Sequence, residues 1–291
     1  MKKPVDQQAS WSGATQPRPV PALQRAQGRA RIGLCCDDGQ VTRLADLFQQ
    51  GCLKVRLPRP QTPRMLDAVV INTSGGLTGG DALAIEVDAA KGALVTVTTP
   101  ACERIYRSSG GDALVHQCLR VGCGARLDWL PQETILFDSC RLRRRLDVRL
   151  EQDAEITLAE GLLFGRAAMG EALGSGLVSD FWTIRRDGQL LFADAVHLSE
   201  PLAATMACPS TLHAGLAMAT ILHVGAGIEA KRDTLRSVLG ERKEARAGVS
   251  VVGGVLVVRI VAWSGAALRA LLVSALGPLR GGCALPRNWF C

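Results

Sequence analysis

The residue types that carry out catalysis do not fall into a catalytic arrangement in this sequence. It has no G-x-S-x-G motif for a nucleophilic serine. Glu133 and Asp138 are close enough in sequence to act as a general acid and base, but nothing fixes their separation, and solvated surface acids are an equal alternative. The four histidines lie in ordinary strand-like contexts: His116, His197, His213 and His223. The sequence therefore predicts a protein that is not an enzyme.

The most distinctive stretch is Asn72–Asp81, NTSGGLTGGD, which contains Gly75, Gly76, Gly79 and Gly80. A phosphate-binding loop needs a Lys followed by Ser or Thr, and it opens onto a helix. Here there is no Lys, and an alternating strand-like segment follows. The glycines instead predict backbone with positive φ or close chain approach, with Asp81 at the mouth of the loop.

Metal ligation by thiols is weakly indicated. The ten cysteines form no C-x-x-C pair, but His116 and Cys118 share one face of a predicted strand, with Cys123 close behind. A half-buried strand without a metal is the favoured interpretation. Lys2 and Lys3 are followed by polar residues rather than an apolar run, so no secretory signal is expected, and reduced thiols in the cytoplasm are predicted.

A basic stripe is the remaining candidate for binding. Arg141, Arg143, Arg145 and Arg149 occupy alternate positions of one predicted strand, while Arg144 breaks the pattern. Such a face could attract nucleic acid or an acidic protein, and a solvated outer face is the alternative. The aromatic residues that stack on bases are not interleaved with the arginines, which disfavours nucleic acid.

The elements that must position these residues are mainly β-strands. The chain has 291 residues and a formal net charge of +7. Four segments each show two alternating stretches around a short turn, and the turns recur after 32, 29 and 35 residues. They are Asp81–Pro100, Ala113–Pro131, Leu142–Glu160 and Phe181–Leu198. This predicts stacked antiparallel strand–turn–strand layers, a β-helix or sandwich-like body.

The last third of the chain departs from this alternation. Ile228–Gly240 and Gly265–Gly277 have helical apolar spacing and end on glycine, so they predict two α-helices. Val249–Trp263 is too short and too interrupted for a membrane span, and it predicts a buried strand pair. We expect a flexible tail over residues 1–30 and a single β-rich domain over residues 31–291.

Four motifs resemble the urease accessory protein UreD family, also called UreH. They are NTSGGLTGGD (72–81), TTPACERIYRS (98–108), PQETILFD (131–138) and FGRAAMGE (164–171). The ending LPRNW (285–289) is similar too, and the resemblance covers nearly the whole chain from about Arg31. Among motif residues it implies structural roles for Tyr106, Arg107, Arg166 and Trp289, as well as for the loop glycines.

The resemblance implies a non-enzymatic scaffold or chaperone for nickel insertion into apo-urease. It implies binding to UreF, which bridges to the GTPase UreG, and docking of that assembly on urease. The family is also proposed to conduct Ni²⁺ through its interior, so transient Ni²⁺ is expected and no tightly bound cofactor. The alternative is a β-rich nucleic-acid-binding protein that uses the stripe from Arg141 to Arg149.

A route for Ni²⁺ must bind the ion weakly, because thiolate and imidazole sites would retain it. We therefore expect oxygen ligands from residues in or beside the motifs: Asp81, Thr98, Thr99, Glu133, Asp138, Glu160 and Glu171. Each also has a local structural alternative, such as a turn acceptor for Asp81 or an ion pair with Arg166 for Glu171. Cys102 lies inside a motif and could add a stronger ligand than such a route needs.

Overall fold

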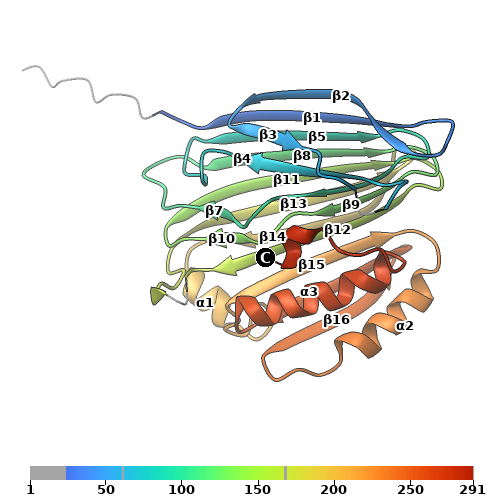
Figure 1. Cartoon of the computed structure of the whole chain (residues 1–291). Helices are drawn as coiled ribbons and strands as arrows, with labels where there is room; N and C mark the ends of the chain where they lie inside the picture. Colours follow the sequence, from blue (N-terminus) through green and yellow to red (C-terminus); the bar gives the residue numbers. More distant parts are fainter. Residues whose placement is uncertain (1–23, 61, 167–168, 291) are drawn as a thin grey trace, which may run out of the picture.

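The computed structural model describes residues 24–60, 62–166 and 169–290. Two β-sheets form the body (Figure 1). The first, sheet A, has in spatial order β14 (Gln189–Leu198), β13 (Gly176–Arg186), β11 (Cys140–Leu150), β8 (Ala113–Val121), β5 (Ala82–Ala89), β1 (Gln27–Cys36) and β2 (Thr42–Gly51). The second, sheet B, has β16 (Ala245–Val252), β17 (Val255–Ala262), β15 (Ala217–Val224), β12 (Glu155–Phe164), β9 (Arg126–Leu130), β6 (Leu94–Thr98), β4 (Leu66–Asn72) and β3 (Leu53–Arg56). Two short strands, β10 (Thr134–Leu136) and β7 (Glu103–Ile105), extend sheet B beside β12.

The stacked layers are confirmed, but their strand pairing differs from the prediction. In the unit Asp81–Pro100, β5 joins sheet A and β6 joins sheet B, and each pairs in parallel with the corresponding strands of the neighbouring layers. The next two units behave in the same way. The predicted antiparallel hairpin is therefore wrong for these three units, and only the fourth, β13 with β14, forms one. Alternation reports which side of a strand is buried, and it does not identify the strand beside it.

The core lies between the two sheets. Strand β11 alternates buried and exposed residues along its whole length, with Leu142, Leu146 and Val148 facing inward. Residues of sheet B such as Trp129 and Leu158 pack in the same core. Burial of each large apolar side chain stabilises the folded state by about 1.5–3 kcal/mol relative to its exposure, and this burial holds the two sheets together.

A second core lies on the other side of sheet B, where the carboxyl-terminal third packs (Figure 1). The two predicted helices are confirmed as α2 (Ile228–Leu239) and α3 (Gly265–Leu279). β16 with β17 form the predicted strand pair, but only β17 is largely buried, because β16 is the edge strand of sheet B. Ser264 begins α3 because its hydroxyl accepts a hydrogen bond from the N–H of Ala267 at 3.1 Å. A short helix, α1 (Leu202–Ala207), was not predicted.

The amino-terminal boundary differs from the expected tail. Strand β1 begins at Gln27, so residues 27–30 pair with β2 and β5 rather than belonging to a tail. Residues 1–23 of that predicted tail lie outside the described residues. Within the described ranges, no helix combines the length and the apolar character needed to cross a membrane.

Candidate functional site

The glycine-rich loop is a structural device at one end of the sheets. Gly75, Gly76 and Gly80 have positive φ, as predicted. Gly79 allows close chain approach, because a Cβ there would lie 2.1 Å from the hydroxyl oxygen of Ser108. Asp81 is 4% exposed, and its two carboxylate oxygens accept the backbone N–H groups of Ala26 and Thr78, each at 2.7 Å. Its oxygens therefore hold the loop against the start of β1.

Aromatic and arginine side chains from the motifs gather beside this loop. The rings of Tyr106 and Phe137 meet edge to face with centroids 4.8 Å apart. The guanidinium of Arg166 lies 4.4 Å from the Phe137 centroid and pairs with Glu171 at 2.6 Å. This ion pair lowers the pKa of Glu171. Glu171 therefore forms the ion pair with Arg166 that the sequence analysis gave as the alternative to a role in binding Ni²⁺.

Asp138 is also occupied by local partners. One of its oxygens accepts the N–H groups of Gly174 and Ser175 at 2.9 and 3.0 Å, and the other pairs with Arg107 at 3.2 Å. Burial opposes ionisation of Asp138, but the hydrogen bonds from Ser175 and Gly174 outweigh it and lower its pKa. Asp138 fixes the loop that leads into β13.

A cavity of about 60 Å³ lies between the sheets and contains the most unusual polar group of the core. Arg144 of β11 points inward and is 6% exposed. It pairs with Glu160 of β12 at 2.5 Å and with Asp180 of β13 at 2.6 Å. Trp129 donates its indole N–H to Glu160 at 2.9 Å. Arg144 was singled out in the sequence only as a break in the stripe.

The pKa values of this group reflect its burial. Burial raises the pKa of Glu160, and the nearby charge of Asp180 acts in the same direction against the effect of Arg144. Burial opposes the charge on Arg144, but Asp180 and Glu160 outweigh it and raise its pKa. Two carboxylates thus share a single guanidinium in a low-dielectric core.

Further oxygen atoms line the same cavity. Thr99, Gln117, Gln132 and Thr134 contribute hydroxyl and amide groups, and Glu103 contributes a carboxylate. Within the described part of the chain, the side-chain oxygen of Gln117 is buried with no hydrogen-bond partner. Burial raises the pKa of Glu103, although Asn72 donates to it at 3.1 Å. Apart from Arg144, the cavity is therefore lined mainly by apolar side chains and by side chains with oxygen atoms that could bind a cation.

Glu133 lies next to this cavity, on the side of helix α3. It pairs with Arg269 of α3, and its second oxygen is buried without a hydrogen-bond partner among the described residues. The thiol of Cys102 lies 3.6 Å from Glu133, and burial together with that carboxylate raises the thiol pKa. Arg269 also binds the side chain of Gln132, which lines the cavity.

Thr98 has a different role. Its hydroxyl accepts the indole N–H of Trp289 at 3.3 Å, and Trp289 also donates to the carbonyl of Leu130 at 3.2 Å. The side chain of Arg269 stacks at 4.7 Å from the Trp289 centroid. Thr98 therefore fastens the carboxyl-terminal segment to sheet B.

The structure thus brings together only part of the predicted site. Thr99 and Glu160 line one cavity and Glu133 adjoins it, whereas Asp81, Asp138 and Glu171 serve loops at the end of the sheets. Sequence reasoning missed five polar residues that line the cavity and one that bounds it: Glu103, Gln117, Gln132, Thr134 and Arg144 in the lining, and Asp180 beside Arg144. Arg144 and Asp180 each occupy a core-facing position on a strand whose other core-facing residues are mostly apolar. A charged residue at such a position was the sequence signal that could have identified them.

The other candidates lie on the outer face of sheet A. His116 is exposed and pairs with Asp147 at 3.0 Å, while Cys118 is buried. Among the described residues, no three His, Cys, Asp or Glu side chains converge as a metal site. The arginine stripe does point outward, but Asp112 pairs with Arg141 and Arg143.

The structure is a β-rich body of stacked layers, in which motif side chains such as Asp81, Asp138 and Glu171 hold loops in place. A family model described as "UreD urease accessory protein" matches residues 26–289. The chain therefore belongs to the UreD urease accessory protein family. Because its relatives are named as accessory proteins, it is classed with these and not with the enzymes.

Curated relatives match over nearly the whole length. A urease accessory protein UreD from Rhizobium johnstonii is 46% identical over 266 residues, which covers 91% of this chain and 96% of the relative. One from Chelativorans sp. is 48% identical over 271 residues, covering 93% and 96%. One from Agrobacterium fabrum is 42% identical over 285 residues, covering 98% of each.

Proposed function

We propose that this protein is a cytoplasmic scaffold required for nickel insertion into apo-urease, and that it acts in a complex with UreF and, through UreF, with UreG. Its family membership and the names of its relatives support a place in urease maturation. The scaffold role fits a chain whose motif side chains are engaged in holding loops and layers.

We further propose that Ni²⁺ passes through the protein by way of the cavity between the sheets. The single observation that supports this is the carboxylates at that cavity: Glu103 and Glu160 line it together with the Arg144 guanidinium, and Asp180 pairs with that guanidinium from the neighbouring strand. An excess of buried carboxylates attracts a divalent cation, and hydroxyl and amide oxygens such as those of Thr99 and Gln117 bind it weakly. Of the residues predicted for the route, Thr99, Glu133 and Glu160 keep this role, with Thr98 beside them.

Asp81, Asp138 and Glu171 are proposed only as positions at the end of the route. Each already accepts hydrogen bonds or an ion pair from protein groups. A cation there would have to displace those partners, which makes them weaker candidates than the cavity residues.

The test is nickel delivery in cells. A strain that lacks the gene should make urease protein with little nickel, and the wild-type gene should restore the metal content, measured by mass spectrometry on purified urease. Glu103→Gln, in the cavity, should restore less nickel than Glu86→Gln, a carboxylate on the outer face of β5. Fully loaded urease in the deletion strain would refute the proposal, and equal rescue by both variants would refute the route.

Partner binding is tested separately by co-purification. The tagged wild-type chain should retain UreF, and it should retain UreG only when UreF is present. Recovery of UreG without UreF would contradict the proposed order of assembly.

A further inference from the structure

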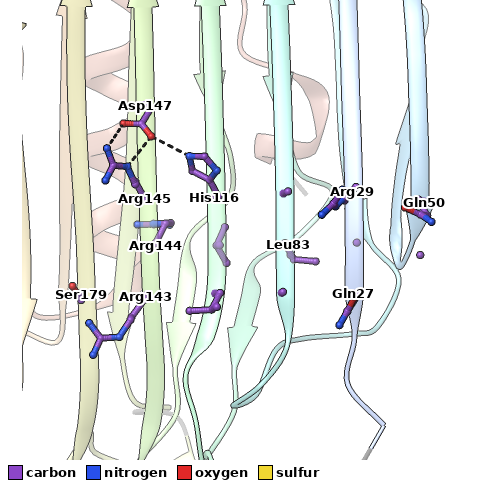
Figure 2. A pocket seen from close by; sticks show the side chains of 16 residues that line it. Gln27, Arg29, Gln50, Leu83, His116, Arg143, Arg144, Arg145, Asp147 and Ser179 are labelled. Atoms are coloured by element: carbon purple, nitrogen blue, oxygen red, sulfur yellow. Dashed lines mark hydrogen bonds and ion pairs between the residues drawn. The ribbon is translucent and has the colours of Figure 1, made fainter.

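A trough with a volume of about 870 Å³ lies on the solvent-facing side of sheet A (Figure 2). It lies on the opposite side of sheet A from the cavity between the sheets, although Leu83, Val115 and Arg144 border both spaces. Its lining comes from adjacent strands of sheet A. Its position includes part of the arginine stripe that the proposed nickel route does not use.

Two rows of paired residues build the trough. In the first row, Arg29 of β1 stands beside Ala84 of β5, and His116 of β8 follows, with Arg145 of β11 at the end. In the second row the corresponding residues are Gln27, Ala82, Leu114 and Arg143. Successive rows are two residues apart along each strand, so both sets of side chains point to the same face.

The alanines form the floor. Ala82 and Ala84 end at Cβ and stand between the longer side chains of β1 and β8. Arg29 and His116 are two of these longer side chains (Figure 2). Neighbouring strands are about 4.8 Å apart, so the flanking strands β1 and β8 are separated by about 10 Å. Their side chains narrow the space further, which leaves room for one extended chain and excludes an α-helix with its diameter of about 10–12 Å.

The walls are positively charged. Arg29 is exposed and forms no ion pair with any described residue. On the opposite wall, Arg143 shares Asp112 with Arg141, and Arg145 shares Asp147 with His116, so each carboxylate has more than one basic partner. Asp147 is the single carboxylate among the residues that line the trough, and it is shared by Arg145 and His116. Beyond Ala84, the outward positions of β5 are Glu86 and Asp88, and they stand beside Arg31 and Arg120 of the flanking strands, so opposite charges offset each other there.

An apolar contact completes the surface. Leu114 is 50% exposed on the wall beside Ala82, in a row that contains no charge except that of Arg143. An exposed leucine next to guanidinium groups suits a ligand that alternates acidic and aliphatic side chains along an extended backbone.

We propose that this trough binds an extended acidic segment of a partner protein. Carboxylates of the segment pair with Arg29 on one wall and with Arg143 or Arg145 on the other, while an aliphatic side chain covers Leu114. Nucleic acid fits less well, because no Phe, Tyr or Trp side chain lines the trough to stack on bases. The proposal does not depend on nickel transport.

The test uses the purified full chain and a fluorescein-labelled peptide of alternating Glu and Leu, followed by fluorescence anisotropy. Binding should be strongest at low salt and should weaken as salt rises, because exposed charge pairs are screened. Arg29→Glu should weaken binding by about tenfold or more, since it reverses an unpaired wall charge. Ala84→Trp, which fills the floor from the solvent side, should abolish binding.

The matched control is Arg149→Glu, the same charge reversal at an exposed position of β11 outside the trough. It should leave peptide binding within about twofold of the wild type, because only general charge is altered. Circular dichroism checks that each variant is folded. If Ala84→Trp does not fold, the binding measured for Arg29→Glu alone tests the proposal. Equal losses for Arg29→Glu and Arg149→Glu, equal binding of a Lys–Leu peptide, no peptide binding at low salt, or displacement of the peptide by oligo-dT would each overturn the proposal.

Discussion

Arg144 of sheet A and Glu160 of sheet B form an ion pair across the core, with 2.5 Å between Nη1 and Oε2 and side chains only 5% and 3% exposed. Asp180 binds the same guanidinium from the neighbouring strand. Hydrogen bonds from Trp129 to Glu160 and from Trp182 to Asp180 satisfy further oxygen atoms. The cluster therefore fixes the relative position of the two sheets at the cavity.

Replacing Arg144 by Met should destabilise the fold substantially. The change leaves two buried carboxylates without their cation, which costs about 3–5 kcal/mol for a broken buried pair. Urea unfolding of the purified variant measures the difference. Arg145→Met is the matched control on the same strand, where an exposed ion pair contributes about 0–1 kcal/mol. Similar losses for the two variants would contradict the structural role of Arg144.

His223 should make stability depend on pH. It is 1% exposed, and it accepts a hydrogen bond from Lys231 at 2.8 Å while the other ring nitrogen donates to Thr157 at 3.0 Å. Burial, with the positive charges of Lys231 and Arg126, lowers its pKa to about 3. The ring is therefore neutral in the folded protein, while in the unfolded chain it takes up a proton below about pH 6.5.

Because the unfolded chain then binds more protons, the free energy of unfolding should fall as pH decreases from about 6.5 toward 3. His223→Gln should reduce that slope by up to about 1.4 kcal/mol per pH unit. Denaturant unfolding at several pH values measures it, with His197→Gln, an exposed histidine of β14, as control. An unchanged slope in His223→Gln would show that another group causes the pH dependence.

The cysteines should differ in reactivity. Cys208 is exposed, and hydrogen bonds from Ser210 lower its pKa. Burial and the charge of Glu133 raise the pKa of Cys102. Since the thiolate is the reactive form, iodoacetamide at neutral pH should modify Cys208 well before Cys102. Mass spectrometry of timed samples gives the order, and faster modification of Cys102 would contradict it.

Gly79→Ala should disrupt the glycine-rich loop. The new Cβ would lie 2.1 Å from the Ser108 hydroxyl and 2.3 Å from the carbonyl of Gly110, so the backbone must shift. Overpacking of this kind costs about 1–3 kcal/mol. Thermal unfolding should show a lower midpoint than for Gly248→Ala, where no atom lies within 4 Å of the added Cβ. Equal midpoints would show that the loop adjusts without cost.

The sequence alone located most elements correctly. Alternation along Leu142–Leu150 identified which side of β11 faces the core, and helical spacing with terminal glycine identified α2 and α3. These signals are local, because burial of one face repeats with the period of the element itself. The glycines of Asn72–Asp81 were likewise readable, since positive φ and close approach restrict the residue type at each position.

The pairing of strands could not be predicted from these local patterns. The turn Ala90–Ala93 between β5 and β6 is consistent with a hairpin, yet it carries the chain from one sheet to the other. Antiparallel and parallel pairing bury the same alternating face, and the choice between them depends on strands far away in sequence. The parallel stacking of layers was therefore decided only in the folded structure.

The sequence by itself determined the family through its motifs, the β-rich character through its alternation, and the outward stripe of arginines through its period of two. The tertiary structure alone decided that Glu160 meets Arg144 and Asp180, that Asp81 and Asp138 serve loops, and that Ala84 lies in a trough between charged walls. The reason is physical: a residue's own strand fixes the face on which it stands, whereas its partners come from other strands that only the packed layers bring near.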